Sequence, residues 1–325
     1  MTNCIRVHET GGPEALVWEE QAVSDPGAGE VLLRQTAVGM NYIDVYFRTG
    51  LYPSPGLPFT PGMEGAGVVV GLGEGVTYFN VGDRVAYAGA PIGAYAERRL
   101  MPAERLVAIP DEIDDQTAAA MLLKGMTAQY LLLRSATLKA GDTVLFHAAA
   151  GGVGLIACQW ARHLGLRVIG TVGSEEKAEL AAAHGCDFPV IYTKENFVDR
   201  VREITKGEGV SVVYDSVGKD TFQDSLGCLR PLGLMVSFGQ SSGPVAPIDI
   251  GILNLMGSLF LTRPSLLHYT ATREDLLETA NDLIRVVREG VVKIEVKQTY
   301  PLKDAARAHE DLEGRRTMGS TVLLP

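Results

Sequence analysis

Cysteines are scarce in this sequence, and none of them belongs to a motif. Cys4, Cys158, Cys186 and Cys228 are widely separated among 325 residues, and no CxxC pair occurs. This spacing argues against a disulfide framework and against a zinc site built from cysteines. The six histidines also form no HxxxH or HxH cluster. The sequence therefore predicts no metal site.

Long apolar runs and excess positive charge are also absent. No run approaches the length of a membrane span, and Met1–Arg6 lacks the apolar region of a signal peptide. We therefore expect a cytoplasmic protein. The net charge of −10 argues against a nucleic-acid surface as the main site. The length and the 46% hydrophobic content predict a globular protein of two domains.

The most informative motif is a glycine-rich turn. The apolar run 143–146 precedes HAAAGGVG at 147–154, and a helical pattern follows at 155–161. This is the dinucleotide-binding fingerprint with Ala149 in the first glycine position, followed by Gly151 and Gly154. Small residues let the backbone approach a pyrophosphate, which the N-terminus of the helix then binds. A tight turn without a ligand is the alternative interpretation.

The next predicted strand, 166–172, lacks the acidic residue that usually follows it in NAD sites. Gly173 and Ser174 stand there instead, and Lys177 follows one turn into the next predicted helix. A 2′-phosphate fits this pattern without charge repulsion, and Lys177 can pair with it. Ser174 is also the predicted N-cap of that helix. We predict NADPH rather than NADH, with a solvated helix lysine as the alternative role of Lys177.

The pattern of predicted secondary structure changes along the chain. Short β-type runs at 30–34, 67–70 and 83–87 alternate with glycine and proline turns, which predicts a barrel-like β domain. Alternating strands and helices then predict a doubly wound parallel sheet. Its candidate strands are 143–146, 166–172, 190–191, 210–214, 234–238 and 258–261.

The C-terminal part is predicted to return to the first domain. It contains a candidate helix at 273–289, a strand at 293–296, a helix at 302–313 and a strand at 321–324. The expected domains are residues 1–122 plus 270–325 and residues 123–269.

Several multi-residue motifs occur in a characteristic order. They are GMNYID (39–44), RTGLYP (48–53), PGMEGAGVV (61–69), GDRV (82–85), AAAGGVG (148–154), YDSVG (214–218), SFGQ (237–240) and TRPS (262–265). Together they resemble the zeta-crystallin-like quinone oxidoreductase branch of the medium-chain dehydrogenase/reductase superfamily. The resemblance covers essentially the full length. It implies an α/β fold, in which a GroES-like β-barrel-type catalytic domain accompanies a Rossmann domain that binds NADPH.

The zinc-dependent alcohol dehydrogenases of the same superfamily are the nearest alternative. Where they have a catalytic cysteine, this chain has the Asn41 region, and where they have a Gly-His-Glu motif, it has Met63. Neither asparagine nor methionine is a typical zinc ligand. Without zinc, no Lewis acid polarises an alcohol. We therefore expect no zinc and a substrate that accepts hydride readily, such as a quinone or an activated alkene.

The resemblance also implies which residues line the site, with the nicotinamide in the cleft between the domains. The catalytic candidates are Asn41, Tyr46 and Tyr52. Asn41 would hydrogen-bond to cofactor or substrate. The tyrosines would shape the quinone pocket or donate a proton. The alternative is that Asn41 is an ordinary turn residue and that Tyr46 and Tyr52 are core aromatics.

The predicted cofactor-binding residues come from both domains. For several of them a structural role is the alternative. Lys124 can be a hinge residue, Tyr192 a packed residue at a strand end and Phe238 a core residue, and the two arginines can be solvated. They are Asn41, Asp44, Lys124, Thr127, Ala149, Gly151, Gly152, Val153, Gly154, Gly173, Ser174, Lys177, Tyr192, Ser216, Val217, Phe238, Gly239, Gln240, Arg263 and Arg316.

The resemblance implies zinc-independent reduction of quinones by NADPH in a homodimer that pairs through the edge of the nucleotide-domain sheet. Two alternatives stay open. One is an NADPH-dependent reductase of activated C=C bonds, such as enones or alkenals. The other is an NADPH-binding protein with a structural or RNA-binding role, against which the negative charge argues.

Overall fold

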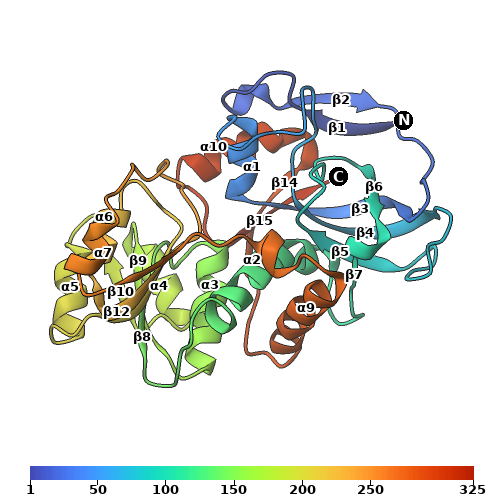
Figure 1. Cartoon of the computed structure of the whole chain (residues 1–325). Coiled ribbons are helices and arrows are strands. Elements are labelled where there is room, and N and C mark those ends of the chain that lie inside the picture. Colours follow the sequence, from blue (N-terminus) through green and yellow to red (C-terminus); the bar gives the residue numbers. More distant parts are fainter. The chain divides into compact units, whose positions relative to one another are not determined.

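The computed structural model describes all 325 residues, which form two compact units (Figure 1). Unit 1 comprises Met1–Met126, Thr270–Leu283 and Ile294–Pro325, and unit 2 comprises Thr127–Tyr269 and Ile284–Lys293. The stretch Ile284–Lys293, which the sequence analysis assigns to the first domain, thus groups with unit 2. Helix α2 (Asp115–Leu133) contributes residues to both units. No helix combines the length and apolarity that a membrane crossing requires.

Unit 2 contains a six-stranded sheet in the order β10-β9-β8-β11-β12-β13, and every pairing in it is parallel. This confirms the predicted doubly wound sheet. The order reverses at β8, so the loop after β8 lies at the switch point where such sheets bind ligands. The strands are β8 (Thr143–Phe146), β9 (Arg167–Val172), β10 (Phe188–Ile191), β11 (Val210–Asp215), β12 (Leu229–Ser237) and β13 (Phe260–Thr262).

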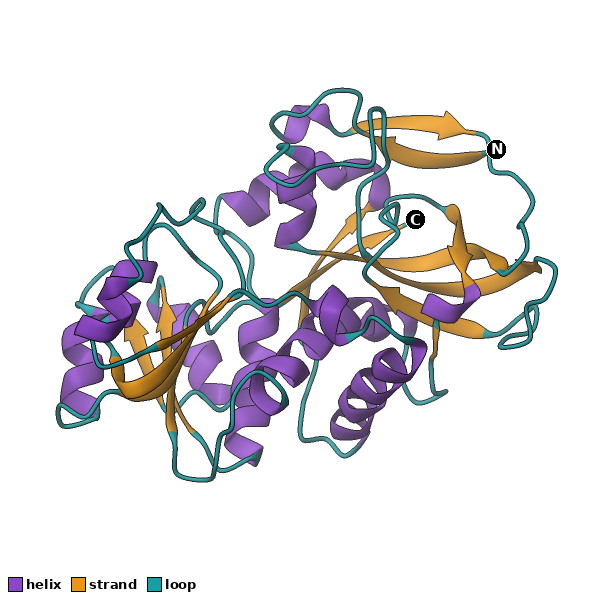
Figure 2. Ribbon diagram, in the orientation of Figure 1, coloured by secondary structure: helices purple, strands orange, loops and turns teal.

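Helices connect the strands of unit 2, as a parallel sheet requires, and one further helix, α8, follows the last strand (Figure 2). They are α3 (Gly152–His163), α4 (Glu175–Ala183), α5 (Phe197–Ile204), α6 (Phe222–Leu226), α7 (Gly251–Leu255) and α8 (Leu266–Tyr269). Strand residues such as Leu145, Ile169 and Val213 form one buried core with Phe222 of α6.

Unit 1 is built on a mainly antiparallel sheet in the order β14-β15-β3-β4-β5-β7, with β6 also paired to β3. The C-terminal strands, red in Figure 1, thus complete a sheet that begins with N-terminal strands. The elements are β3 (Glu30–Met40), β4 (Glu64–Leu72), β5 (Arg84–Ala88), β6 (Arg98–Pro102), β7 (Val107–Ala108), β14 (Val296–Pro301), β15 (Ser320–Leu324) and a separate pair, β1 (Thr2–Arg6) and β2 (Val17–Gln21).

Apart from its part of α2, unit 1 has one long helix, α9 (Arg273–Arg288), whose C-terminal residues group with unit 2. Helix α1 (Tyr42–Arg48) follows β3 directly, and α10 (Ala305–Glu313) follows the 3₁₀ turn η3 (Leu302–Asp304). Two further 3₁₀ turns are η1 (Pro13–Ala15) and η2 (Ala103–Arg105).

One predicted strand was wrong. The sequence pattern placed a strand at 293–296, whereas β14 spans Val296–Pro301. Its residues alternate between half-buried and exposed, because β14 is the edge of its sheet and pairs only with β15. The apolar content of VKQTYP is therefore low, and the more apolar stretch before it gave the stronger signal.

Candidate functional site

The glycine turn of unit 2 joins β8 to α3. Gly151 is the extended N-cap residue of α3, and no side chain caps that helix. The first N–H groups of a helix lack intrahelical acceptors, so this N-terminus suits a phosphate. Ala148 precedes it with a positive φ of 56° and is exposed.

Close packing explains the small residues of this turn. A Cβ atom on Gly154 would lie 2.5 Å from the Ala148 oxygen and 2.6 Å from the Ala149 oxygen, so only glycine fits there. Ala149 occupies the first glycine position because its neighbour on β9 is itself a glycine. A Cβ on Gly170 would lie 2.6 Å from the Ala149 Cβ.

His147, just before the turn, belongs to the core. Its Nδ1 lies 2.9 Å from Thr171 Oγ1, and its Nε2 lies 2.8 Å from Ser225 Oγ. Burial lowers the pKa of His147. The imidazole is therefore a neutral, hydrogen-bonded structural group.

The carboxyl ends of β9 and β10 bring together four predicted cofactor residues. Ser174 is the N-cap of α4, as predicted, and its Oγ accepts from the Lys177 N–H at 3.3 Å. Tyr192 packs against Gly173, where a Cβ would lie 2.8 Å from the phenol oxygen, yet 42% of Tyr192 is exposed. One of the two nearby glutamates, Glu175, forms an ion pair with Lys194. The corner therefore offers a lysine, a hydroxyl and a phenol, with no acidic residue at the strand end.

The ends of β11 and β12 form a second cluster, which is organised by a residue that the sequence analysis missed. Asp215 is fully buried and accepts from the N–H groups of Val217 (2.7 Å) and Gly218 (3.1 Å) and from Thr221 Oγ1 (2.9 Å). The Phe238 N–H donates to the Asp215 carbonyl at 2.8 Å. Asp215 was visible in the motif YDSVG as a strand-end aspartate.

The other predicted residues of this edge pack beside Asp215. A Cβ on Gly239 would lie 2.6 Å from the Ser216 oxygen, so the two loops touch. The Phe238 ring is half-buried, 5.8 Å from that of Phe146. Arg263 donates to the Ser237 carbonyl at 2.8 Å. Gln240 is half-buried. Thr127 is not part of these loops; it lies on α2 and is buried.

In unit 1, Asn41 is fixed by a buried ion pair. Its Nδ2 donates to Glu64 Oε2 at 2.8 Å, and Lys124 Nζ donates to the same oxygen at 2.9 Å. The Leu123 N–H donates to Glu64 Oε1 at 2.8 Å. Glu64 is fully buried and Lys124 nearly so. Glu64 lies in the motif PGMEG but was not predicted as a site residue.

Asn41 also begins helix α1. Its side chain accepts from the Asp44 N–H while Asp44 Oδ2 accepts from the Asn41 N–H, a reciprocal capping box. Asp44 is completely buried. The amide of Asn41 is therefore held in one orientation by Glu64 and Asp44.

Three tyrosines pack around α1. The ring centroids of Tyr42 and Tyr46 are 5.5 Å apart, and those of Tyr46 and Tyr52 are 5.0 Å apart. Tyr46 is 7% exposed and Tyr52 is half-buried. Arg316, by contrast, lies on the surface of unit 1, where its Nε donates to Asp311 at 2.7 Å.

The donor set does not fit a zinc ion. No group of three or more His, Cys, Asp or Glu side chains is arranged to hold a metal ion. Met63, in the position of the zinc-binding histidine, is buried beside Glu64.

Comparison with known proteins gives full-length matches. The family model of the alcohol dehydrogenase GroES-like domain matches residues 27–111, and the model described as zinc-binding dehydrogenase matches residues 152–285. The chain is 52% identical to a quinone oxidoreductase of Pseudomonas aeruginosa over 325 residues, covering 100% of both chains. It is 50% identical to a 2-haloacrylate reductase of a Burkholderia species over 326 residues, covering 98% of both. The crystal structure of Escherichia coli quinone oxidoreductase complexed with NADPH matches with a TM-score of 0.98 and 49% identity, covering 99% of this chain and 100% of that one.

Proposed function

This chain belongs to the quinone oxidoreductase family of the medium-chain dehydrogenase/reductases, and from this premise we propose that it reduces quinones with NADPH. The observation that carries the proposal is the corner of unit 2 at Gly173, Ser174, Lys177 and Tyr192. It provides donors for a 2′-phosphate, and no acidic residue stands directly after β9, where NAD sites usually have one.

Other predicted residues bind the remaining parts of the cofactor. The N-terminus of α3, from Gly151 to Gly154, holds the pyrophosphate. The loops that Asp215 supports, with Ser216, Val217 and Phe238–Gln240, hold the nicotinamide portion, which supplies the reducing equivalents when bound. Arg263 contributes at the same edge of the sheet and Thr127 from α2. Arg316, a residue of unit 1, supplies positive charge for a phosphate.

Residues of unit 1 receive the quinone. Asn41, oriented by Glu64, presents its remaining hydrogen-bonding capacity to cofactor or quinone. Tyr46 and Tyr52, whose rings are tilted by 53° to each other, provide aromatic surface for the quinone ring. Lys124 and Asp44 act through Glu64 and Asn41, because both are buried in hydrogen-bonded networks. The reaction proceeds without zinc, and the reduced oxygen takes its proton from water.

A second candidate activity is the reduction of activated C=C bonds by NADPH. The 50% identity to a 2-haloacrylate reductase favours it specifically. Both reactions need a positioned nicotinamide and an electron-poor acceptor, so the same residues serve both.

Steady-state NADPH oxidation with 1,4-benzoquinone and with 2-chloroacrylate separates the two activities. We expect kcat/KM to be higher for the quinone. Faster turnover of 2-chloroacrylate would instead establish the second candidate. Negligible NADPH oxidation with every quinone tested would refute the proposal.

A further inference from the structure

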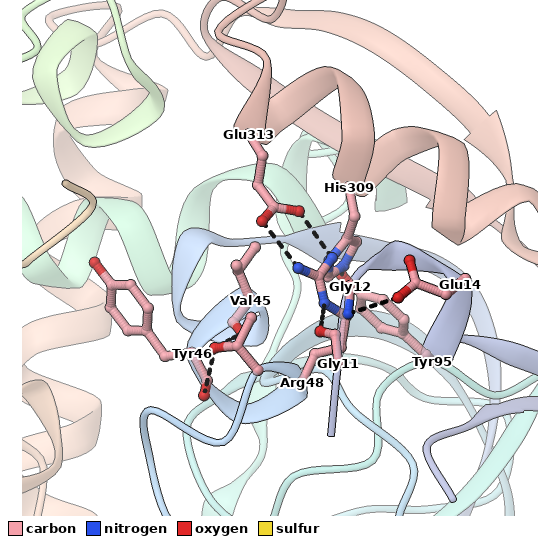
Figure 3. Close-up of polar contacts among 10 residues, drawn as sticks. Gly11, Gly12, Glu14, Val45, Tyr46, Arg48, Tyr95, His309 and Glu313 are labelled. Atoms are coloured by element: carbon pink, nitrogen blue, oxygen red, sulfur yellow. Dashed lines mark hydrogen bonds and ion pairs between the residues drawn. The ribbon is translucent and has the colours of Figure 1, made fainter. Parts of the chain in front are cut away.

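A buried arginine holds the C-terminal turn of α1 against α10. Arg48 is 1% exposed and forms a two-pronged ion pair with Glu313, with distances of 2.8 and 2.9 Å (Figure 3). Its Nη1 also lies 3.2 Å from His309 Nδ1. Since a guanidinium can only donate, Nδ1 accepts and the ring proton resides on Nε2. Burial and the charge of Arg48 lower the pKa of His309 to about 3, so the ring is neutral.

The same histidine reaches the N-terminal turn of α1 through a tyrosine. His309 Nε2 donates to Tyr95 Oη at 2.9 Å, and Tyr95 Oη donates to Asp44 Oδ2 at 3.1 Å. Asp44 Oδ2 also accepts from the Asn41 N–H at 2.9 Å. Tyr95, His309 and Asp44 are all completely buried. One imidazole from α10 therefore ties both ends of this seven-residue helix.

We propose that Tyr95 and His309 are positioning residues for quinone reduction, which fix α1 and thereby the placement of Asn41 and Tyr46. The proposal rests on the function proposed above. Asn41 is the N-cap of α1, and Tyr46 lies between the two anchored residues, Asp44 and Arg48. Figure 3 shows Tyr46 projecting from α1 away from the Arg48 cluster, so the anchored face and the tyrosine face are different.

The direction of the hydrogen bonds excludes this network as a proton pathway. Every proton points from Arg48 through His309 and Tyr95 toward Asp44, and Arg48 does not give up its proton near neutral pH. If His309 passed its Nε2 proton to Tyr95, its Nδ1 would need a new proton from Arg48, which does not release one. The network therefore acts by orientation alone.

The charge state of Asp44 sets the strength of the anchor. Burial raises the pKa of Asp44 to about 7, opposed by hydrogen bonds from Asn41 and Tyr95 and by the charge of Lys124. The titratable and charged groups around it are Arg48 on α1, Glu64 on β4, Tyr87 on β5, Tyr95 before β6, Lys124 on α2 and His309 on α10. The carboxylate accepts hydrogen bonds more strongly than the neutral acid, so the anchor tightens as pH rises through about 7.

Replacing the phenol hydroxyl tests the proposal. Tyr95→Phe removes a donor that favours ionised Asp44, so the pKa of Asp44 rises further and activity appears only at higher pH. We expect kcat/KM at pH 6 to fall about tenfold, with recovery toward the wild-type value at high pH. The matched control is Tyr300→Phe, which removes a phenol that donates to Asp311 of α10 at 2.7 Å and not to Asp44. Its pH profile should coincide with that of the wild type.

A second measurement follows the protonation of Asp44 directly and is then compared with the kcat/KM profiles. Aspartate labelled with ¹³C at its carboxyl carbon reports the titration of Asp44 in the free protein, and Asp44→Asn identifies the resonance by its loss. Asp44→Asn should also abolish the rise of kcat/KM near pH 7. If the resonance moves in Tyr95→Phe but the kcat/KM profile does not, or if Asp44→Asn keeps the wild-type profile, the positioning role is refuted. Failure of the proposed function looks different, because the wild type then turns over no quinone at any pH.

Discussion

At the scale of single residues, we predict that the choice between NADPH and NADH depends on Lys177. Its helix begins at the Ser174 cap, beside Gly173 and the half-exposed Tyr192. Lys177→Ala removes the positive charge that we assign to the 2′-phosphate. We expect NADPH to bind roughly ten- to a hundredfold more weakly, since hydrogen bonds to charged groups are worth about 1.5–3 kcal/mol. Binding of NADH should stay unchanged, as measured by fluorescence titration.

The matched control for this prediction is Lys303→Ala, which removes an exposed lysine of unit 1. It should bind both cofactors as the wild type does. The assignment of Lys177 is wrong if NADH binds as tightly as NADPH and Lys177→Ala changes neither affinity.

Features of single residues were predictable where the residues that define them lie close together in the sequence. The small residues of the glycine turn, the Ser174 cap and the missing acid were all evident from a few adjacent positions. Glu64 was not recognised as a site residue, because its partners Asn41 and Lys124 are 23 and 60 positions away. His309 contacts Arg48 across 261 positions, and no local pattern encodes such a pair. The Asn41–Asp44 capping box did carry a local signal, since N-cap and N3 residues are three apart.

At the scale of elements, the β8–α3 unit depends on how tightly α3 packs on its own turn. Gly154→Ala places a methyl group 2.5 Å from a backbone oxygen, which no flexible side chain can relieve. We expect a loss of about 1–3 kcal/mol in the free energy of unfolding, typical of overpacking. NADPH affinity should fall with it, because the turn must shift. Urea unfolding and NADPH titration measure the two effects.

Gly27→Ala is the control for this substitution, because the added Cβ meets only the end of the flexible Glu30 side chain, at 3.2 Å. It should change neither the unfolding transition nor NADPH binding. Wild-type stability and NADPH affinity in Gly154→Ala would contradict the close packing described here.

Elements with strong apolar patterns were predicted well, whereas the polar edge strand β14 was not. The strand Thr143–Phe146 was predicted to the residue, because it is flanked on both sides by other strands and almost wholly apolar. Strand β14 was misplaced because its half-buried, polar sequence resembles a loop. Helix α1 was not predicted as a helix, since seven residues give too little periodicity.

At the scale of the whole molecule, unit 2 ends its sheet at an exposed edge. Strand β13 pairs only with β12, so its outer edge has no partner within the chain. Large exposed apolar side chains lie on β13 and α7. Phe260 of β13 is 60% exposed, Leu255 of α7 is 84% exposed, and Ile250, the N-cap residue of α7, is 77% exposed. Exposed apolar groups beside an open strand edge favour association. We therefore propose that two copies pair here as a homodimer.

Sedimentation analysis tests this pairing, since a dimer has twice the 34.8 kDa mass of the chain. Phe260→Asp places a charge at the centre of the proposed contact, where it would be buried without a partner. We expect this variant to sediment as a monomer at micromolar concentration. The matched control, Val81→Asp, alters a residue of unit 1 that is equally exposed at 61%, and it should remain dimeric. A wild-type monomer would refute the dimer. A Phe260→Asp variant that stays dimeric would place the contact elsewhere, because a buried, unpaired carboxylate costs more than a single strand edge contributes.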